Sequence, residues 1–115
     1  MTYTGSCHCG KIAYTVEAEM QDAVECNCSI CQRRGYLLWF LPRSALHLKT
    51  PENAMKYYTF NTHRIRHYFC PECGSATFGM GKDGKGNEMV AVNLRCLEGI
   101  DLTGVKRKFF DGRKL

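Results

Sequence analysis

The sequence contains no apolar run that approaches the roughly 18 residues that a membrane-spanning helix needs, so we expect no membrane partner. Its opening segment, MTYTGSCHCG, lacks a basic stretch followed by an apolar core, so we expect no secretory signal and a cytoplasmic location. Low-complexity segments are missing, as are repeats with a period of about 20–50 residues. With 115 residues, the chain is predicted to form one small domain over residues 1–115.

Long segments with the periodicity of an amphipathic helix are also missing from the sequence. Short alternating runs take their place, and one of them puts Ile12, Tyr14 and Val16 on the same side of a strand. Strands are predicted at residues 11–17, 23–26, 36–41, 46–49, 56–60, 65–69, 76–78 and 89–94, with a helical turn at 29–34 and a glycine-rich turn at 79–87. The chain is therefore predicted to have an all-β fold of about eight short strands.

The most informative feature that the sequence does contain is its eight cysteines. They form C-x-C, C-x-C-x-x-C and C-x-x-C clusters followed by one isolated cysteine, at Cys7, Cys9, Cys26, Cys28, Cys31, Cys70, Cys73 and Cys96. An even number is compatible with disulfides, but without an export signal the thiols are expected to stay reduced. Because these short spacings bring pairs of sulfurs close enough for one tetrahedral ion, we predict zinc rather than disulfides.

Two of the clusters lie far apart in the sequence and together supply four thiolates. Cys7 and Cys9 are predicted to share one zinc ion with Cys70 and Cys73, which would tie the N-terminal strand to the central hairpin. A zinc ion closed by four thiolates is of the structural type and contributes directly to folding. A domain of this size has a small core and would gain from such a site.

The remaining cluster, CNCSIC, supplies three thiolates, from Cys26, Cys28 and Cys31. Three protein ligands with one free position are typical of a catalytic zinc ion. A second interpretation stays open, in which Cys96 or a histidine closes the site and both zinc ions are structural; the histidines are His8, His47, His63 and His67. Zinc on three thiolates is a weak Lewis acid that suits a soft thiol, so the first interpretation predicts thiol addition to an aldehyde, or its reversal.

Three segments of the chain, GSCHCGKIAY, CNCSICQ and HYFCPECGSATF, resemble the glutathione-dependent formaldehyde-activating family, whose domain is shared with centromere protein V. They occur in the family's order and, with VNLRCLEGI, cover most of the chain. The resemblance implies a stacked-sheet fold (β-tent), a structural zinc ion on the C-x-C and C-x-x-C cysteines, and a second zinc ion on the C-x-C-x-x-C cysteines, where the thiol binds. It also implies a carbon–sulfur lyase of the kind that joins glutathione to formaldehyde as S-hydroxymethylglutathione.

The residues and the resemblance together predict a zinc enzyme of the carbon–sulfur lyase class with two Zn²⁺ ions per chain. Its substrates would be a small thiol such as glutathione and an aldehyde, and its candidate catalytic residues are Cys26, Cys28 and Cys31. The alternative is a non-catalytic module in which both zinc ions serve structure or partner binding.

Charged residues near the clusters and at the end of the chain are interpreted as solvated surface. Arg33 and Arg34 follow the second cluster and would be able to bind a substrate carboxylate, but a single basic pair is a weak signal. The net charge is +5, and basic residues cluster only in residues 106–114. The cysteine spacing also lacks the cysteine and histidine ligands of a DNA-binding zinc finger, so we expect no nucleic-acid partner.

The other notable side chains are expected to be structural. Trp39 and Phe40 are predicted to pack in the core, although one of them would be able to form a pocket wall. His63 and His67 flank the strand before the C-x-x-C segment and are predicted to be polar surface rather than proton-transfer groups. Cys96 is predicted to be a small buried hydrophobe.

Overall fold

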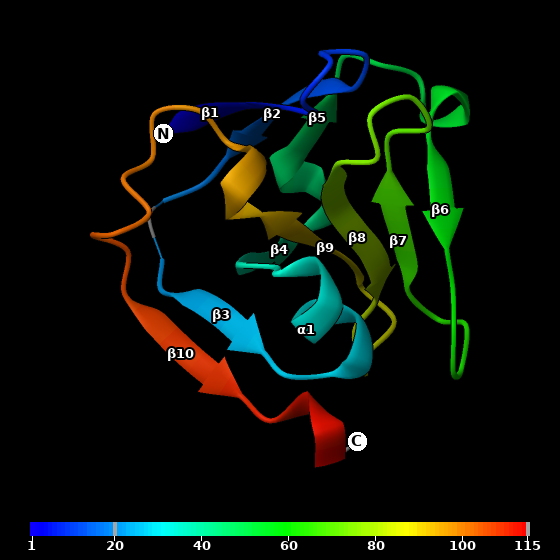
Figure 1. Ribbon diagram of the computed structural model, residues 1–115, viewed down its shortest axis with the longest axis vertical. Helices are drawn as coiled ribbons and strands as arrows, with labels where there is room; N and C mark the ends of the chain where they lie inside the picture. The colour runs from blue at the N-terminus through cyan, green and yellow to red at the C-terminus, as the bar shows by residue number, and fades with distance from the viewer. Residues whose placement is uncertain (20, 115) are drawn as a thin grey trace.

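The computed structural model describes residues 1–19 and 21–114, and it is built mainly of short strands (Figure 1). The strands are β1 (Thr2–Ser6), β2 (Ala13–Glu17), β3 (Ala23–Cys26), β4 (Leu38–Pro42), β5 (Leu46–Leu48), β6 (Lys56–Tyr58), β7 (Arg66–Phe69), β8 (Ala76–Lys82), β9 (Glu88–Asn93) and β10 (Arg107–Phe110). The helical elements are α1 (Ser29–Arg34) and four short 3-10 turns, η1 (Arg43–Ala45), η2 (Glu52–Ala54), η3 (Leu94–Cys96) and η4 (Gly112–Lys114). The all-β prediction is confirmed. Among the described helices, none has the length and apolar character required to span a membrane.

The predicted glycine-rich turn at residues 79–87 is partly wrong, because β8 continues through its first half. The turn itself begins at Asp83, whose amide donates a hydrogen bond to the Asn87 carbonyl at 2.9 Å. Gly79 stays in the strand, where it pairs with His67 of β7, and an added Cβ would make only an ordinary contact of 3.6 Å with the Arg66 carbonyl oxygen. Glycine is depleted in strands, so the glycine-rich run favours a turn, but pairing of β8 with both β7 and β9 overrides this local signal.

The described residues form ten strands where the pattern predicts about eight, and the two that were not predicted are β1 and β10. β1 buries only Tyr3 and Gly5 between polar residues, which is a weak alternation. All four residues of β10 are exposed, and the strand exists because it pairs in parallel with β3, more than 80 residues earlier in the chain. Pairing of this kind depends on a distant partner rather than on a local pattern.

The strands form two sheets (Figure 1). The smaller sheet has the order β1-β2-β5, and the larger sheet has the order β10-β3-β4-β9-β8-β7-β6. The described neighbours pair antiparallel except for β10 and β3. Phe110 of the edge strand β10 and residues of the loop that follows β6, the other edge strand, line one cavity beside α1, so this sheet curves around the helix.

The core lies between the two sheets and contains most of the buried aromatic residues. Tyr3 of the smaller sheet meets Trp39 of the larger sheet edge to face at 5.5 Å, and Tyr14 meets Phe78 in the same way at 5.2 Å. Trp39 is therefore a core residue, as predicted. Phe40, the next residue of β4, points away from this core and is 51% exposed, because side chains alternate along a strand. The prediction of Phe40 as a core residue is wrong.

Candidate metal centre and adjoining cavity

The first cysteine cluster brings together two segments from different parts of the fold. The Sγ atoms of its four members, which we call the four-cysteine cluster, all lie within 4.8 Å of one another: Cys7, Cys9, Cys70 and Cys73. Sγ of Cys9 is 3.6 Å from Sγ of Cys7 and 3.6 Å from Sγ of Cys70. A tetrahedral zinc ion with zinc–sulfur bonds of about 2.3 Å requires sulfur–sulfur distances of about 3.8 Å. The donor set therefore fits a single tetrahedral ion.

Local backbone geometry orients the sulfurs of this cluster. Gly74 adopts a left-handed φ of 81°, which closes the turn after Cys73, and its amide donates to the Cys70 carbonyl at 2.9 Å. The amide of Ile12 donates to Sγ of Cys7 at 3.2 Å. Hydrogen bonding to Ser75 lowers the pKa of Cys73 to about 5. Amide and hydroxyl donors of this kind favour thiolates, the form in which cysteine binds metals.

The second group, which we call the cysteine trio, consists of Cys26, Cys28 and Cys31, whose Sγ atoms also lie within 4.8 Å of one another. Cys26 ends β3, Cys28 is the N-cap of α1, and Cys31 lies on the buried side of α1. Partial burial opposes ionisation of Cys28, but the neighbouring Cys31 amide and the Cys31 and Cys26 thiols outweigh it and lower the pKa of Cys28. The amide of Cys28 donates a hydrogen bond to Sγ of Cys26 at 3.4 Å. Like the four-cysteine cluster, the trio could hold a metal ion.

Among residues 1–19 and 21–114, no other cysteine, histidine or carboxylate atom joins the trio at that distance. Cys96 lies elsewhere, where its Sγ donates to the Ala76 carbonyl at 3.6 Å and burial raises its pKa to about 11. His47 pairs with Glu17 at 3.4 Å, and His63 shares a 2.7 Å hydrogen bond with Thr59. None of the side chains that the sequence offered as a fourth ligand is placed as one.

The C-terminal segment packs directly on the trio, a contact that the sequence did not predict. The Asn27 side chain donates to Oδ1 of Asp111 at 2.8 Å, and the amide of Arg113 donates to Oδ1 of Asn27 at 3.0 Å. Between them, Gly112 lies so close that an added Cβ would be 2.5 Å from Sγ of Cys26. Only a glycine fits here without displacement. The interpretation of residues 106–114 as simple solvated surface is therefore incomplete.

A cavity of about 500 Å³ adjoins the trio. The cysteines form one part of its wall, and the other lining residues come from α1, from strands β4, β7, β8 and β9, from the loop between β6 and β7, and from the C-terminal segment. Phe40 lines this cavity, which explains why it faces away from the core. His67 lines it too and is half-buried, so its interpretation as polar surface is wrong. Burial and, secondarily, the Arg34 guanidinium lower the pKa of His67, which keeps the imidazole neutral near pH 7.

The two arginines after the trio do not line the cavity. The Arg33 guanidinium is exposed and donates to the Ser29 carbonyl at 3.0 Å. The Arg34 guanidinium donates to the Tyr36 hydroxyl at 2.9 Å and lies 5.6 Å from the centre of the Phe69 ring. The interpretation of Arg33 as surface charge agrees with the structure, whereas Arg34 is half-buried and orders neighbouring side chains.

Comparison with known proteins gives concordant results. Residues 2–110 match the family described as "Glutathione-dependent formaldehyde-activating enzyme". The fold is similar to a crystal structure of a Rhodobacter sphaeroides protein, with a TM-score of 0.78 and 31% sequence identity over 96% of this chain and 100% of that chain.

Proposed function

The chain belongs to the glutathione-dependent formaldehyde-activating enzyme family, and on that premise we propose that it is a zinc-dependent carbon–sulfur lyase acting on adducts of a thiol and an aldehyde. The observation that carries the proposal is the cysteine trio, which opens onto a cavity and has no fourth protein ligand among the described residues. Three protein ligands with an open position are the arrangement of a catalytic metal. The four-cysteine cluster would hold the structural ion.

Zinc is the metal that best suits both donor sets. Each set consists of thiolates at tetrahedral spacing, and soft sulfur ligands select zinc over hard cations. All eight cysteines are free of disulfides, in keeping with a reducing compartment such as the cytoplasm. Bound at the trio, zinc would supply an electrophilic centre that lowers the pKa of an incoming thiol and fixes the position of its sulfur.

The residues around the trio are suited to handling the thiol proton. In the forward reaction a carbon–sulfur bond forms, the carbonyl π bond breaks, and the thiol proton ends on the former carbonyl oxygen. The neutral His67 imidazole lines the same cavity and can accept a proton on one ring nitrogen and return it. The reverse reaction uses the same group in the opposite order. No oxidant or reductant is needed.

The experiment that tests this function compares three cysteine variants. Glutathione and formaldehyde exchange with their adduct in solution, and NMR exchange spectroscopy measures how far the zinc-loaded protein accelerates that exchange. Cys28→Ser is expected to fold but to reduce the acceleration to background, because it removes one ligand of the trio. Cys70→Ser is expected to lose the folded state, because it removes a ligand of the structural site. Cys96→Ser, outside both sites, is the matched control and should retain both zinc ions and the activity.

The alternative, a non-catalytic two-zinc module, predicts a different pattern. In that case the fourth ligand of the trio zinc comes from a protein side chain, and Cys28→Ser destabilises the fold as severely as Cys70→Ser. Wild-type protein would also leave the exchange rate of every thiol–aldehyde pair unchanged. Unchanged exchange for all pairs would exclude the lyase, and a Cys28→Ser variant as unstable as Cys70→Ser would show that the trio is a structural site.

A further inference from the structure

The cavity beside the trio has a wall of stacked rings. The Phe60 ring stacks on His67 with centroids 5.4 Å apart and planes 29° from parallel, and His67 stacks in turn on Tyr36 at 6.4 Å and 26°. All three rings line the cavity, and we call them the ring ladder. Three rings in one wall make that wall largely apolar, which favours contact with apolar groups.

Charged groups are scarce in the lining. Among the lining residues that the structure describes, Arg113 alone carries a permanent charge, and its guanidinium already donates a hydrogen bond to the Gln32 side chain. Glutathione carries two carboxylates and an ammonium group besides its thiol. The lining offers no carboxylate for the ammonium group and one engaged cation for two carboxylates. Burying those groups without partners would be costly, so the charged ends of a bound glutathione would have to stay outside the cavity.

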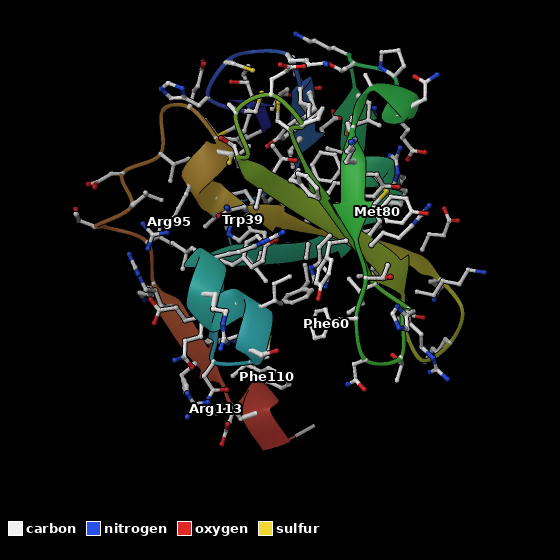
Figure 2. The ribbon with its side chains drawn as sticks, turned by 45° about the vertical axis from the view of Figure 1, so that its right-hand side comes forward. Trp39, Phe60, Met80, Arg95, Phe110 and Arg113 are labelled. Carbon is white, nitrogen blue, oxygen red and sulfur yellow. The ribbon has the colours of Figure 1, made fainter. Side chains whose placement is uncertain are left out.

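Apolar side chains at the cavity mouth are left in contact with water. Phe40 is 51% exposed, Ile65 is 51% exposed and Phe110 is 47% exposed, and all three line the cavity. Phe110 ends β10, whereas Phe60 follows β6, so residues from the two opposite edges of the larger sheet meet here; Figure 2 shows both, together with Arg113. An occupant of the cavity would cover this apolar surface, which favours an apolar occupant.

We propose that the adduct on which this protein acts carries an apolar substituent, aromatic or branched aliphatic, that lies along the ring ladder while its sulfur faces the cysteine trio. This inference deepens the proposed lyase function and rests on it. The substituent belongs either to the thiol or to the aldehyde, since both reactants become parts of one adduct. The bonds made and broken are those of the general reaction, and the substituent itself is unchanged.

Two measurements on the zinc-loaded full chain test the inference. Benzyl alcohol, which has the ring but no thiol, is titrated against ¹⁵N-labelled protein, and saturable shifts are expected for residues that line the cavity. The exchange assay then compares glutathione plus formaldehyde with two apolar pairs, phenylmethanethiol plus formaldehyde and glutathione plus phenylacetaldehyde. At least one apolar pair is expected to be accelerated about tenfold or more beyond glutathione plus formaldehyde. The pair that responds identifies which reactant carries the substituent.

A matched pair of variants on β10 connects the preference to this cavity. Phe110→Asp places a carboxylate in the lining. It is expected to weaken benzyl alcohol binding and to reduce the acceleration of the preferred apolar pair, relative to glutathione plus formaldehyde, by about tenfold or more. Phe109→Asp, at the adjacent position, is the control, because Phe109 is 64% exposed and does not line this cavity. Both substitutions replace an exposed phenylalanine of the same strand.

The outcomes separate this inference from the function on which it rests. If glutathione plus formaldehyde is the best pair and Phe110→Asp behaves like Phe109→Asp, the apolar preference is refuted while the lyase stands. If no pair is accelerated at all, the lyase function is refuted, and the proposed apolar preference is refuted too because it rests on that function. If an apolar pair is preferred and Phe110→Asp alone removes the preference, both are supported.

Discussion

The contact between the C-terminal segment and the cysteine trio makes Gly112→Ala the sharpest perturbation of the candidate site. The added Cβ would lie 2.5 Å from Sγ of Cys26 and 3.0 Å from Cβ of Cys28. Favourable van der Waals contacts of a carbon atom begin at about 3.5 Å, so the C-terminal segment and the trio must separate by about 1 Å. Overpacking of this size costs about 1–3 kcal/mol.

The structure can relieve this overlap in two ways, and both change the geometry around the cysteine trio. Either Cys26 moves relative to Cys28 and Cys31, or the segment lifts and loses the Asn27–Asp111 hydrogen bond. Metal ligands tolerate errors of only about 0.2 Å, so a shift of about 1 Å in one sulfur should weaken zinc binding at the trio. We expect a loss of about 10–100-fold in affinity, the range found when supporting contacts of metal ligands are removed.

Competition with a chromophoric chelator measures this effect, because it reports how many zinc ions each chain retains and how tightly. Wild-type protein should release its two ions at clearly different chelator concentrations, and Gly112→Ala should release the weaker ion about 10–100-fold more readily with the tighter one unchanged. Gly84→Ala is the matched control, since an added Cβ there meets nothing within 4 Å. Identical release curves for Gly112→Ala and wild type would refute the assigned role of the C-terminal segment.

Other predictions concern the imidazole, the core and the structural metal. The pKa of His67, measured by NMR, should lie below the ordinary histidine value of about 6.5. Arg34→Gln should raise that pKa, although burial should still keep it below the ordinary value. Because the lowered pKa makes the unfolded chain bind more protons than the folded one, the free energy of unfolding should fall as the pH drops through 6.5. The fall should be smaller in His67→Gln; an equal pH dependence in this variant and in wild type would contradict the lowered pKa of His67. Phe78→Ala, at a fully buried ring, should cost about 3–5 kcal/mol in denaturant unfolding. Exhaustive chelation should abolish cooperative melting, whereas unchanged melting would show that no structural metal is needed.

The all-β architecture and the grouping of the cysteines were predictable because both depend on local patterns. Alternating apolar residues specify strands such as β2, and the short cysteine spacings restrict where sulfurs can point. The pairing of Cys7 and Cys9 with Cys70 and Cys73 followed from counting thiolates, and the structure brings these four sulfurs together.

The features that were not predicted depend on contacts between distant segments. β10 is exposed on all four residues and is specified by its pairing with β3. Nothing in the sequence around Gly112 distinguishes it from an ordinary loop glycine, because its contact with Cys26 exists only in the folded structure. His67 alternates with the buried Tyr68 along β7, and only the curvature of the larger sheet turns it toward the trio. These positions are set by tertiary structure, on which local sequence carries little information.

The most direct measurement is a zinc-edge anomalous map from crystals of the metal-loaded protein soaked with a thiol. Two zinc peaks are predicted for each chain, one surrounded by four cysteine sulfurs and one bound by Cys26, Cys28 and Cys31 with the sulfur of the soaked thiol as the remaining ligand. A single peak, or a second peak whose remaining ligand is a side chain of the protein itself, would contradict the account.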